Sequence, residues 1–270
     1  MVTTRCALAS GESALARATL YRLLAQAFRY PGASWHEEWD EIARGMSAAL
    51  EVLAQEDRAR PSAARCVPPA LFDAFDLVWA ASRDPQRIRR DHARLVGHSP
   101  RAGTTPYETE WTGAAGEILQ YHLLADLGGF YRAFGLDLAK TCDERHDHLS
   151  IELCFLSFLC VREAAAEERG VTEIVALVCD AQRRFLDEHV LRWARAFGAR
   201  TKKEDPEGFY GRAAVLLERL LEAERARFGL AGEEGFRELR SSSLALEDCC
   251  VSCEHSQGCA GAAGHARDGE

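Results

Sequence analysis

The sequence predicts an all-α protein, a helical bundle of about eight or more helices. Apolar residues recur at three- and four-residue spacing along most of the chain, which is the period of an amphipathic helix. No segment shows the strict alternation of apolar and polar residues that marks a half-buried strand. The chain has 270 residues, of which 47% are hydrophobic and 28% charged. This composition and length allow it to bury a sizeable core.

The first half of the chain contains three predicted helices. The first spans residues 12–29, and a Pro-Gly pair ends it. The second spans 34–57 and stops before a Pro-, Ala- and Arg-rich stretch. The third is an apolar helix centred near residue 75. A segment rich in Gly, Pro, Ser and Thr follows at 97–111, and such long loops inside compact domains are often functional.

The second half contains four clearer helices. They are predicted at 114–134, 147–169, 172–197 and 206–228. The pair Gly128-Gly129 costs roughly 1 kcal/mol per glycine relative to alanine, which predicts close packing or a bend there. Thr172 is the expected N-cap of the helix predicted at 172–197. In the last helix, Asp205 should accept from first-turn amides, Pro206 should take the first position, and Gly229 should form the left-handed cap.

Charge and sequence patterning exclude several classes of protein. The net charge is −9, from 42 acidic and 33 basic side chains, which argues against nucleic acid as a partner. The N-terminus lacks an apolar signal region, and no apolar stretch approaches the ~20 residues of a membrane span. Ten cysteines without a secretory signal suggest reduced thiols or metal ligands. We therefore expect a cytoplasmic protein with no membrane insertion.

Enzymatic motifs are missing from the sequence. It contains no GxxxxGK[ST] phosphate loop, no GxGxxG, no HExxH and no GxSxG. No ExxH pair recurs on separate helices, as di-iron bundles require. The sequence therefore predicts a protein that is not an enzyme.

Three patches of sequence, taken in order, carry a family resemblance. They are LYRLLAQAFRYP at 20–31, TPYETEW at 105–111, and ADLGGFYRAFGLDLAKTCDERHDHLSIELCFLSFL at 125–159. Together they resemble the TorD/DmsD/NarJ family of redox-enzyme maturation chaperones, which are specific for molybdoenzymes. Many members of that family have a proline before the Asp-His pair, whereas this chain has His146. The residue before it is then freer in conformation, so the start of the next helix is less constrained.

The resemblance implies a TorD-like fold with a hinge. It divides the helical chain into an N-terminal part at 1–137, the hinge at 138–147 and a C-terminal helical part at 148–246. After Leu246 the helical periodicity fails, and a Cys/Gly-rich tail follows at 247–270, which is not a general feature of the family. Family members occur as monomers or homodimers, and some exchange helices across the hinge.

The resemblance also implies the partners. These are the catalytic subunit of a molybdoenzyme of the DMSO-reductase superfamily and its twin-arginine leader peptide. The chaperone holds the immature subunit in the cytoplasm until the cofactor is inserted, and it requires no cofactor of its own.

Several candidate binding residues lie at the Asp-His connection. Asp147 is predicted to cap the following helix and, with Glu144, to present carboxylates to the arginine pair of a leader. Such carboxylate–guanidinium contacts can be bidentate. His148 and Glu152 are spaced i, i+4, so they could bond each other as a core pair or form half of a metal site.

The remaining candidates lie on the preceding loop and helix. Tyr107 and Glu108 belong to the loop, where binding residues concentrate, although Tyr107 could equally fasten the loop to the core. Asp126 and Tyr131 lie on the helix before the hinge, and Tyr131 fits either the core or a groove. The predicted client- or leader-binding set is Tyr107, Glu108, Asp126, Tyr131, Glu144, Asp147, His148 and Glu152.

The C-terminal tail supports an alternative function. Four thiols lie within eleven residues, at Cys249, Cys250, Cys253 and Cys259, and could close a zinc site or hold an iron–sulfur cluster. Their spacing matches neither standard pattern, and adventitious metal uptake is the alternative explanation. The competing hypothesis is therefore a metal-delivery or metal-sensing protein that works through this tail.

Overall fold

A computed structural model describes residues 11–59, 70–97, 104–111, 116–139, 142 and 144–231. All of these residues belong to one compact unit, residues 1–240. The described residues form ten α-helices, one 3₁₀ turn and one π-helical turn, and they contain no strand. An isolated antiparallel bridge joins Tyr107 to His148. The predicted all-α fold class is confirmed.

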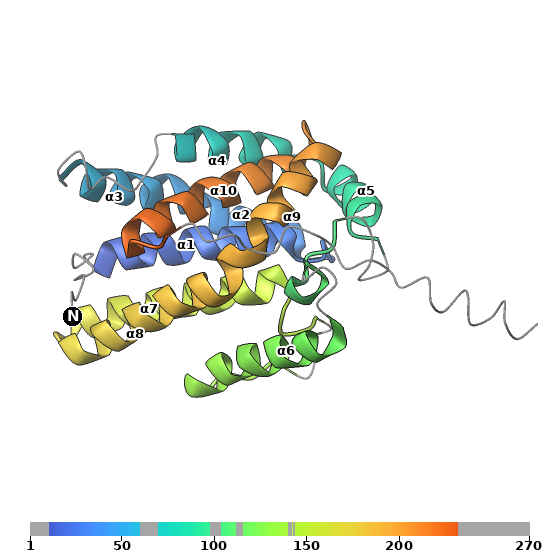
Figure 1. Cartoon of the computed structure of the whole chain (residues 1–270). Coiled ribbons are helices and arrows are strands. Elements are labelled where there is room, and N and C mark those ends of the chain that lie inside the picture. The colour runs from blue at the N-terminus through green and yellow to red at the C-terminus, as the bar shows by residue number, and fades with distance from the viewer. Residues whose placement is uncertain are drawn as a thin grey trace, which may run out of the picture. The chain divides into compact units, whose positions relative to one another are not determined.

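The first helix, α1 (Gly11–Phe28), lies at the centre of the bundle. It packs along α7 (Leu149–Glu168) on one side and against α3 (Met46–Ala59) and α10 (Phe209–Phe228) on the other. Figure 1 shows α1 between these layers, with α8 beside α7. Both the apolar and the polar side chains of α1 are buried to an unusual degree, because neighbouring helices cover nearly its whole circumference.

The segment predicted as one helix at 34–57 is two helices. Helix α2 (Trp35–Arg44) ends at Gly45, and α3 begins at the next residue. Glycine is a poor helix former because ordering its backbone costs more entropy than for any other residue. The break lets α2 turn its stacked Trp35 and Trp39 rings onto Phe209 of α10.

Two short helices cover the other side of α10. Helix α4 (Ala70–Ala81) packs on it, and α5 (Pro85–Leu95) follows after a tight turn. The start of α5 is locally encoded, because the Asp84 side chain accepts from the amide of Arg87 and Pro85 fills the first helical position.

Helix α6 (Gly116–Ala133) lies at the edge of the bundle, next to the 3₁₀ turn η2 (Glu108–Trp111), as Figure 1 shows. The helix continues through Gly128 and Gly129. Gly128 is buried, and a side chain there would press on the Arg132 guanidinium at 3.2 Å, whereas Gly129 faces open space. The contact at Gly128 is with the flexible end of an exposed side chain, and Gly129 has no contact, so close packing requires neither glycine.

The helix predicted at 172–197 is unbroken, but one turn within it is π-helical. Helix α8 (Thr172–Phe185) passes into the π-helical turn η3 (Leu186–Val190) and then into α9 (Leu191–Glu204). The N-cap is Val171, so the prediction of Thr172 as the cap was wrong by one residue. The wider π turn rotates His189 into the interior, where its side chain is fully buried. Such turns are rare and frequently occur at functional sites.

The last helix begins later than predicted. Residues 205–208 form a turn, and α10 starts at Phe209 rather than at Pro206. The Asp205 carboxylate nevertheless accepts from the amides of Tyr210 and Gly211, as expected of a residue that satisfies a first turn. The left-handed Gly229 cap is confirmed, with φ of 61°.

A sealed ion-pair network joins four helices in the core. The Arg17 guanidinium of α1 donates to Glu163 of α7 at 2.9 Å and to Glu224 of α10 at 2.8 and 2.5 Å. It also donates to Gln182 of α8 at 2.6 Å, and the Tyr21 hydroxyl donates to Glu224. Burial by itself would raise the pKa of Glu224, but the ion pair with Arg17 outweighs it and holds that pKa below its ordinary value.

Candidate functional site

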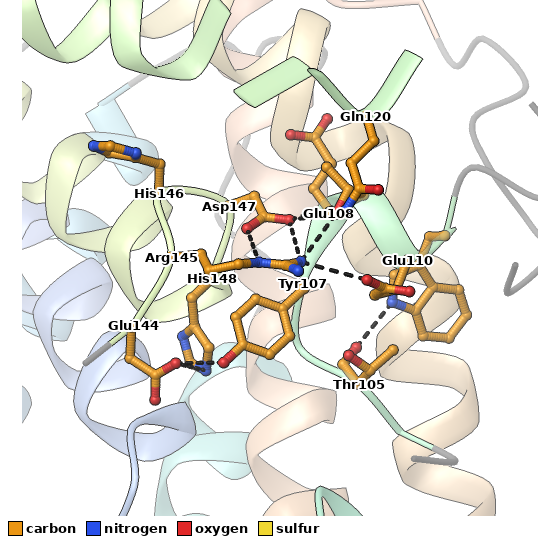
Figure 2. Close-up of polar contacts among 12 residues, drawn as sticks. Thr105, Tyr107, Glu108, Glu110, Gln120, Glu144, Arg145, His146, Asp147 and His148 are labelled. Atoms are coloured by element: carbon orange, nitrogen blue, oxygen red, sulfur yellow. Dashed lines mark hydrogen bonds and ion pairs between the residues drawn. The ribbon is translucent and has the colours of Figure 1, made fainter. Parts of the chain in front are cut away.

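Two segments about forty residues apart in sequence are joined at one place. The amide of Glu108 donates to the carbonyl of Asp147 at 2.9 Å, and the amide of Leu149 donates to the carbonyl of Pro106 at 2.8 Å. These bonds fasten the loop at 104–111 to the bend at 144–148, which leads into α7. We call these two segments together the junction. The second and third sequence patches, which carry the candidate binding residues, therefore meet in space (Figure 2).

Asp147 lies at the centre of this junction with a fully buried carboxylate. Its Oδ2 accepts from the amide of Thr109 at 3.2 Å and from the Thr109 hydroxyl at 2.7 Å. The Arg145 guanidinium donates a hydrogen bond to each carboxylate oxygen of Asp147, both at 2.9 Å. The prediction that Asp147 caps α7 was wrong, because its side chain turns towards the loop and the next residue takes the capping position.

His148 is the N-cap of α7. Its Nδ1 accepts from the amide of Ser150 at 3.1 Å and lies 2.7 Å from the Ser150 hydroxyl. Burial lowers the pKa of His148, so the imidazole is neutral at neutral pH and Nδ1 is free to accept. Glu144 approaches its Nε2 at 3.8 Å.

Tyr107 and Glu144 form the half-buried side of the junction. The Tyr107 hydroxyl donates to Glu144 at 2.5 Å, and the ring packs edge-on against His148 at 5.0 Å. Burial, and then the hydrogen bond to Glu144, raise the pKa of Tyr107, which keeps the hydroxyl protonated. Tyr107 thus fastens the loop to the bend while one ring face remains for Arg145.

Glu108 belongs to a second polar group, deeper in the protein. Its Oε2 lies 3.0 Å from Nδ1 of His189, and both side chains are fully buried. Asp126 of α6, 59% exposed, approaches the other ring nitrogen of His189 at 3.5 Å. Burial raises the pKa of Glu108. The loop position therefore does not make Glu108 accessible, whereas Asp126 reaches solvent.

Glu152 and Tyr131 are core residues. The Glu152 carboxylate accepts from the indole N–H of Trp193 at 3.2 Å and is fully buried. Glu152 therefore binds Trp193, whereas His148 binds Ser150, and the two side chains do not form the predicted pair. Burial raises the pKa of Glu152 well above its ordinary value. The Tyr131 hydroxyl donates to the carbonyl of His146 at 2.9 Å and so fastens α6 to the bend.

Three residues of the junction and one beside it were not predicted from the sequence. Arg145 and Thr109 bind the Asp147 carboxylate, Glu110 lies beside Arg145, and His189 pairs with Glu108. The alternation of charge in Glu144-Arg145-His146-Asp147 was a visible signal for Arg145. No local signal exists for Thr109 or His189, because their partners lie 38 and 81 residues away.

Metal binding has no support among the described residues. No group of three or more His, Cys, Asp or Glu side chains in that part of the chain is arranged to hold a metal ion. Cys249, Cys250, Cys253 and Cys259 lie outside the described residues, so the metal site proposed for the tail stays a prediction. No described helix is both long and apolar enough to cross a membrane.

These features define a class: an all-α protein whose polar junction offers carboxylates and an aromatic ring for noncovalent contacts. The chain belongs to the nitrate reductase delta subunit family, whose model matches residues 33–199. No solved structure matches significantly.

Curated relatives are named as chaperones. The chain is 29% identical to the chaperone protein TorD of Photobacterium profundum over 165 residues, 61% of this chain and 74% of the relative. It is 36% identical to a selenate reductase assembly chaperone of Thauera selenatis, over 40% of this chain and 53% of that protein. A perchlorate reductase assembly chaperone of Dechloromonas aromatica is 25% identical over 78% of this chain and 89% of the relative. The family is one of chaperones, and the chain is not an enzyme.

Proposed function

We propose that the chain is a cytoplasmic chaperone for the immature catalytic subunit of a molybdenum-cofactor oxidoreductase of the DMSO-reductase superfamily. It binds this subunit and its twin-arginine leader and holds them until the cofactor is inserted, before export or assembly. The family membership supports this proposal, and so do relatives named for selenate and perchlorate reductase assembly.

The observation that carries the leader-binding part is an excess of negative charge at the junction. Glu110 and Asp147 contact Arg145, and Glu144 contacts Tyr107, whose ring lies beneath the same arginine, so three carboxylates face one guanidinium among these contacts. The buried His148 is neutral and adds no positive charge. A cluster of this kind favours a cationic segment of a partner, since charge-assisted hydrogen bonds are about twice as strong as neutral ones.

The expected affinity for a leader alone is modest. Burying ~400 Å² of apolar leader surface gains roughly 10 kcal/mol at ~25 cal/mol/Å², while association costs roughly 4–15 kcal/mol. The net of about 6 kcal/mol at most corresponds to a Kd of roughly tens of micromolar at best. A chaperone that must release its client needs such reversibility, and a second contact with the body of the subunit would strengthen capture.

The first test is capture in the native host. The tagged full-length chain is purified from its own host, and mass spectrometry identifies what co-purifies. We expect enrichment of a molybdoenzyme catalytic subunit over an unrelated tagged protein. Enrichment of no such subunit, in cells that express one, would contradict the proposal.

The second test locates the binding surface. Asp147 and His148 are poor targets because both stabilise the bend. We choose the two predicted carboxylates that reach solvent, through Asp126→Asn and Glu144→Gln, and expect about two- to thirtyfold weaker leader binding, since a partly exposed ion pair contributes about 0.2–1 kcal/mol.

The matched control removes the same charge elsewhere. Glu168 and Glu173 are exposed at the end of α7 and the start of α8, and their Gln variants should bind the leader like the wild type. Equal binding by both double variants, measured by fluorescence anisotropy of a labelled leader peptide, would exclude the junction as the leader site.

A further inference from the structure

Arg145 occupies a binding site built for a guanidinium group. Its Nε donates to Oδ1 of Asp147 and its Nη2 to Oδ2, both at 2.9 Å, in a bidentate arrangement. The same Nη2 donates to the Thr109 hydroxyl at 2.9 Å and lies 3.5 Å from Glu110. A planar fork matches this set of acceptors, whereas an ammonium group does not.

An aromatic face completes the site. The Arg145 guanidinium carbon lies 4.4 Å from the centre of the Tyr107 ring, within the range of a cation–π contact. The ring is held in place independently of Arg145, by its hydroxyl bond to Glu144 and its edge contact with His148. We define the guanidinium site as the Asp147 and Glu110 carboxylates, the Thr109 hydroxyl and the Tyr107 ring (Figure 2).

The site is preformed, whereas its occupant reaches solvent. Asp147 and Glu110 are 0% and 6% exposed, while the Arg145 side chain is 34% exposed. Asp147 keeps its position through the amide and hydroxyl of Thr109 even without Arg145. The backbone bonds between the loop and the bend also do not involve the Arg145 side chain. The arginine can therefore leave while the acceptors stay in place.

We infer that Arg145 is an internal ligand of this site, and that it yields the site to an arginine side chain of the client polypeptide. The identity of the client rests on the proposed function, whereas the guanidinium specificity of the site does not. While Arg145 is bound, it competes with the client and lowers the apparent affinity in proportion to its occupancy. If Arg145 fills the site about 90% of the time, its removal tightens binding about tenfold.

The test begins with a small-molecule probe of the emptied site. In the full-length Arg145→Ala variant, millimolar ethylguanidinium should raise the midpoint of thermal unfolding saturably, while ethylammonium at the same concentration should not. Wild-type protein, in which Arg145 competes for the site, should show the rise only at about tenfold higher ethylguanidinium concentration. Absence of a saturable, guanidinium-selective rise in the variant would overturn the inference, whatever the client is.

Arg184→Ala is the matched control. Two nitrogens of Arg184 donate to the Glu188 carboxylate, at 3.0 and 3.3 Å. The Arg184 guanidinium carbon also lies 5.4 Å from the centre of the Phe130 ring. Its partner Glu188 is 39% exposed, so no desolvated acceptor set remains after truncation. Equal rescue of this control by ethylguanidinium would show that the effect is nonspecific and would overturn the inference.

The competition is tested with a peptide that carries two adjacent arginines and a counterpart that carries two lysines. Arg145→Ala should bind the arginine peptide about tenfold more tightly than wild type does, with no comparable gain for the lysine peptide. Arg145→Lys, which keeps a cation beside Asp147 but lacks the fork, covers the case in which the alanine variant fails to fold, and should show a smaller gain. Unchanged or weaker arginine-peptide binding in the folded variants would overturn the competition.

Failure of the proposed function would look different. It would show as absence of a molybdoenzyme subunit among the proteins captured from the host, with ethylguanidinium rescue of Arg145→Ala intact. The probe experiment and the capture experiment therefore fail independently.

Discussion

Two arginines of this protein are each held by carboxylates, in contrasting surroundings. Arg17 lies in the core, 1% exposed, and its partners Glu163 and Glu224 are equally sealed. Arg145 lies on the bend before α7, 34% exposed, with its bidentate partner Asp147 only two residues away. The chemical pairing is the same, but the access of solvent differs.

This difference separates a structural ion pair from an exchangeable one. Arg17 and its partners come from α1, α7, α8 and α10, so the pair is formed only when those helices are packed. A buried charge cannot leave its partner without exposing both to an apolar interior. Arg145 instead has a solvent side into which its charge can move, which is the property that a competing internal ligand requires.

The largest expected effect comes from breaking the core pair. Arg17→Met leaves the buried Glu163 without its cation and Glu224 with only Arg227, at 3.7 Å, and should lower the free energy of unfolding by about 3–5 kcal/mol. Arg145→Ala should lower it by about 1–3 kcal/mol, because Asp147 keeps its bonds to Thr109. Urea denaturation measures both, and equal losses in the two variants would contradict the distinction.

A compensated variant sharpens the core result. When Arg17→Met is combined with Glu163→Gln and Glu224→Gln, both carboxylate charges that faced Arg17 disappear, while Arg227 keeps Glu56 at 3.6 Å. Much of the lost stability should therefore return. A triple variant as unstable as Arg17→Met alone would mean that the loss came from packing and not from charge.

Glu152 provides an intermediate case, a buried carboxyl group with no arginine. Burial raises its pKa in the folded protein, so its contribution to stability is complete below the ordinary pKa of glutamate and is lost as pH rises through the folded-state value. Glu152→Gln removes this dependence. The stability of the wild type relative to this variant should therefore fall as pH increases from 5 to 7, by up to about 1.4 kcal/mol per pH unit.

The measurement is urea denaturation of both proteins across that pH range. Glu168→Gln, which changes an exposed side chain on the same helix, should run parallel to the wild type. A constant difference between wild type and Glu152→Gln would contradict the raised pKa.

The smallest effect is expected at the edge of the junction. Tyr107→Phe removes the hydroxyl bond to Glu144 but keeps the ring beneath Arg145, and should cost about 0.5–1.5 kcal/mol. Arg145 should remain in place, so ethylguanidinium should not stabilise this variant. Saturable stabilisation by ethylguanidinium would mean that Arg145 leaves an intact guanidinium site when the hydroxyl is missing, and would contradict this prediction.

The helices were predictable because their signals are local. The apolar spacing, the glycine cap at Gly229 and the acceptor at Asp205 each act within a few residues, and each was confirmed. Errors arose where local signals compete: Gly45 broke one predicted helix in two, and Asp147 turned from the helix end towards Thr109. Asp147 bonds Thr109, which is distant in sequence, and the N-cap of α7 is therefore His148.

The candidate site was located only in part. The sequence assigned Tyr107, Glu144 and Asp147 to one predicted binding set, and only the structure joins their segments, by the bridge between Tyr107 and His148. It gave no means of knowing that Glu108 pairs with His189, because that pairing depends on a π-helical turn 81 residues away. The division of the chain at a hinge, residues 138–147, stays a prediction.

By itself, the sequence determined the class of fold and the family, because helical periodicity and short motifs are properties of neighbouring residues. Only the tertiary structure decided which charges are sealed and which are exchangeable. Burial is set by helices that arrive from distant parts of the chain, and it is burial that makes Arg17 a fixed part of the core while leaving Arg145 free to move.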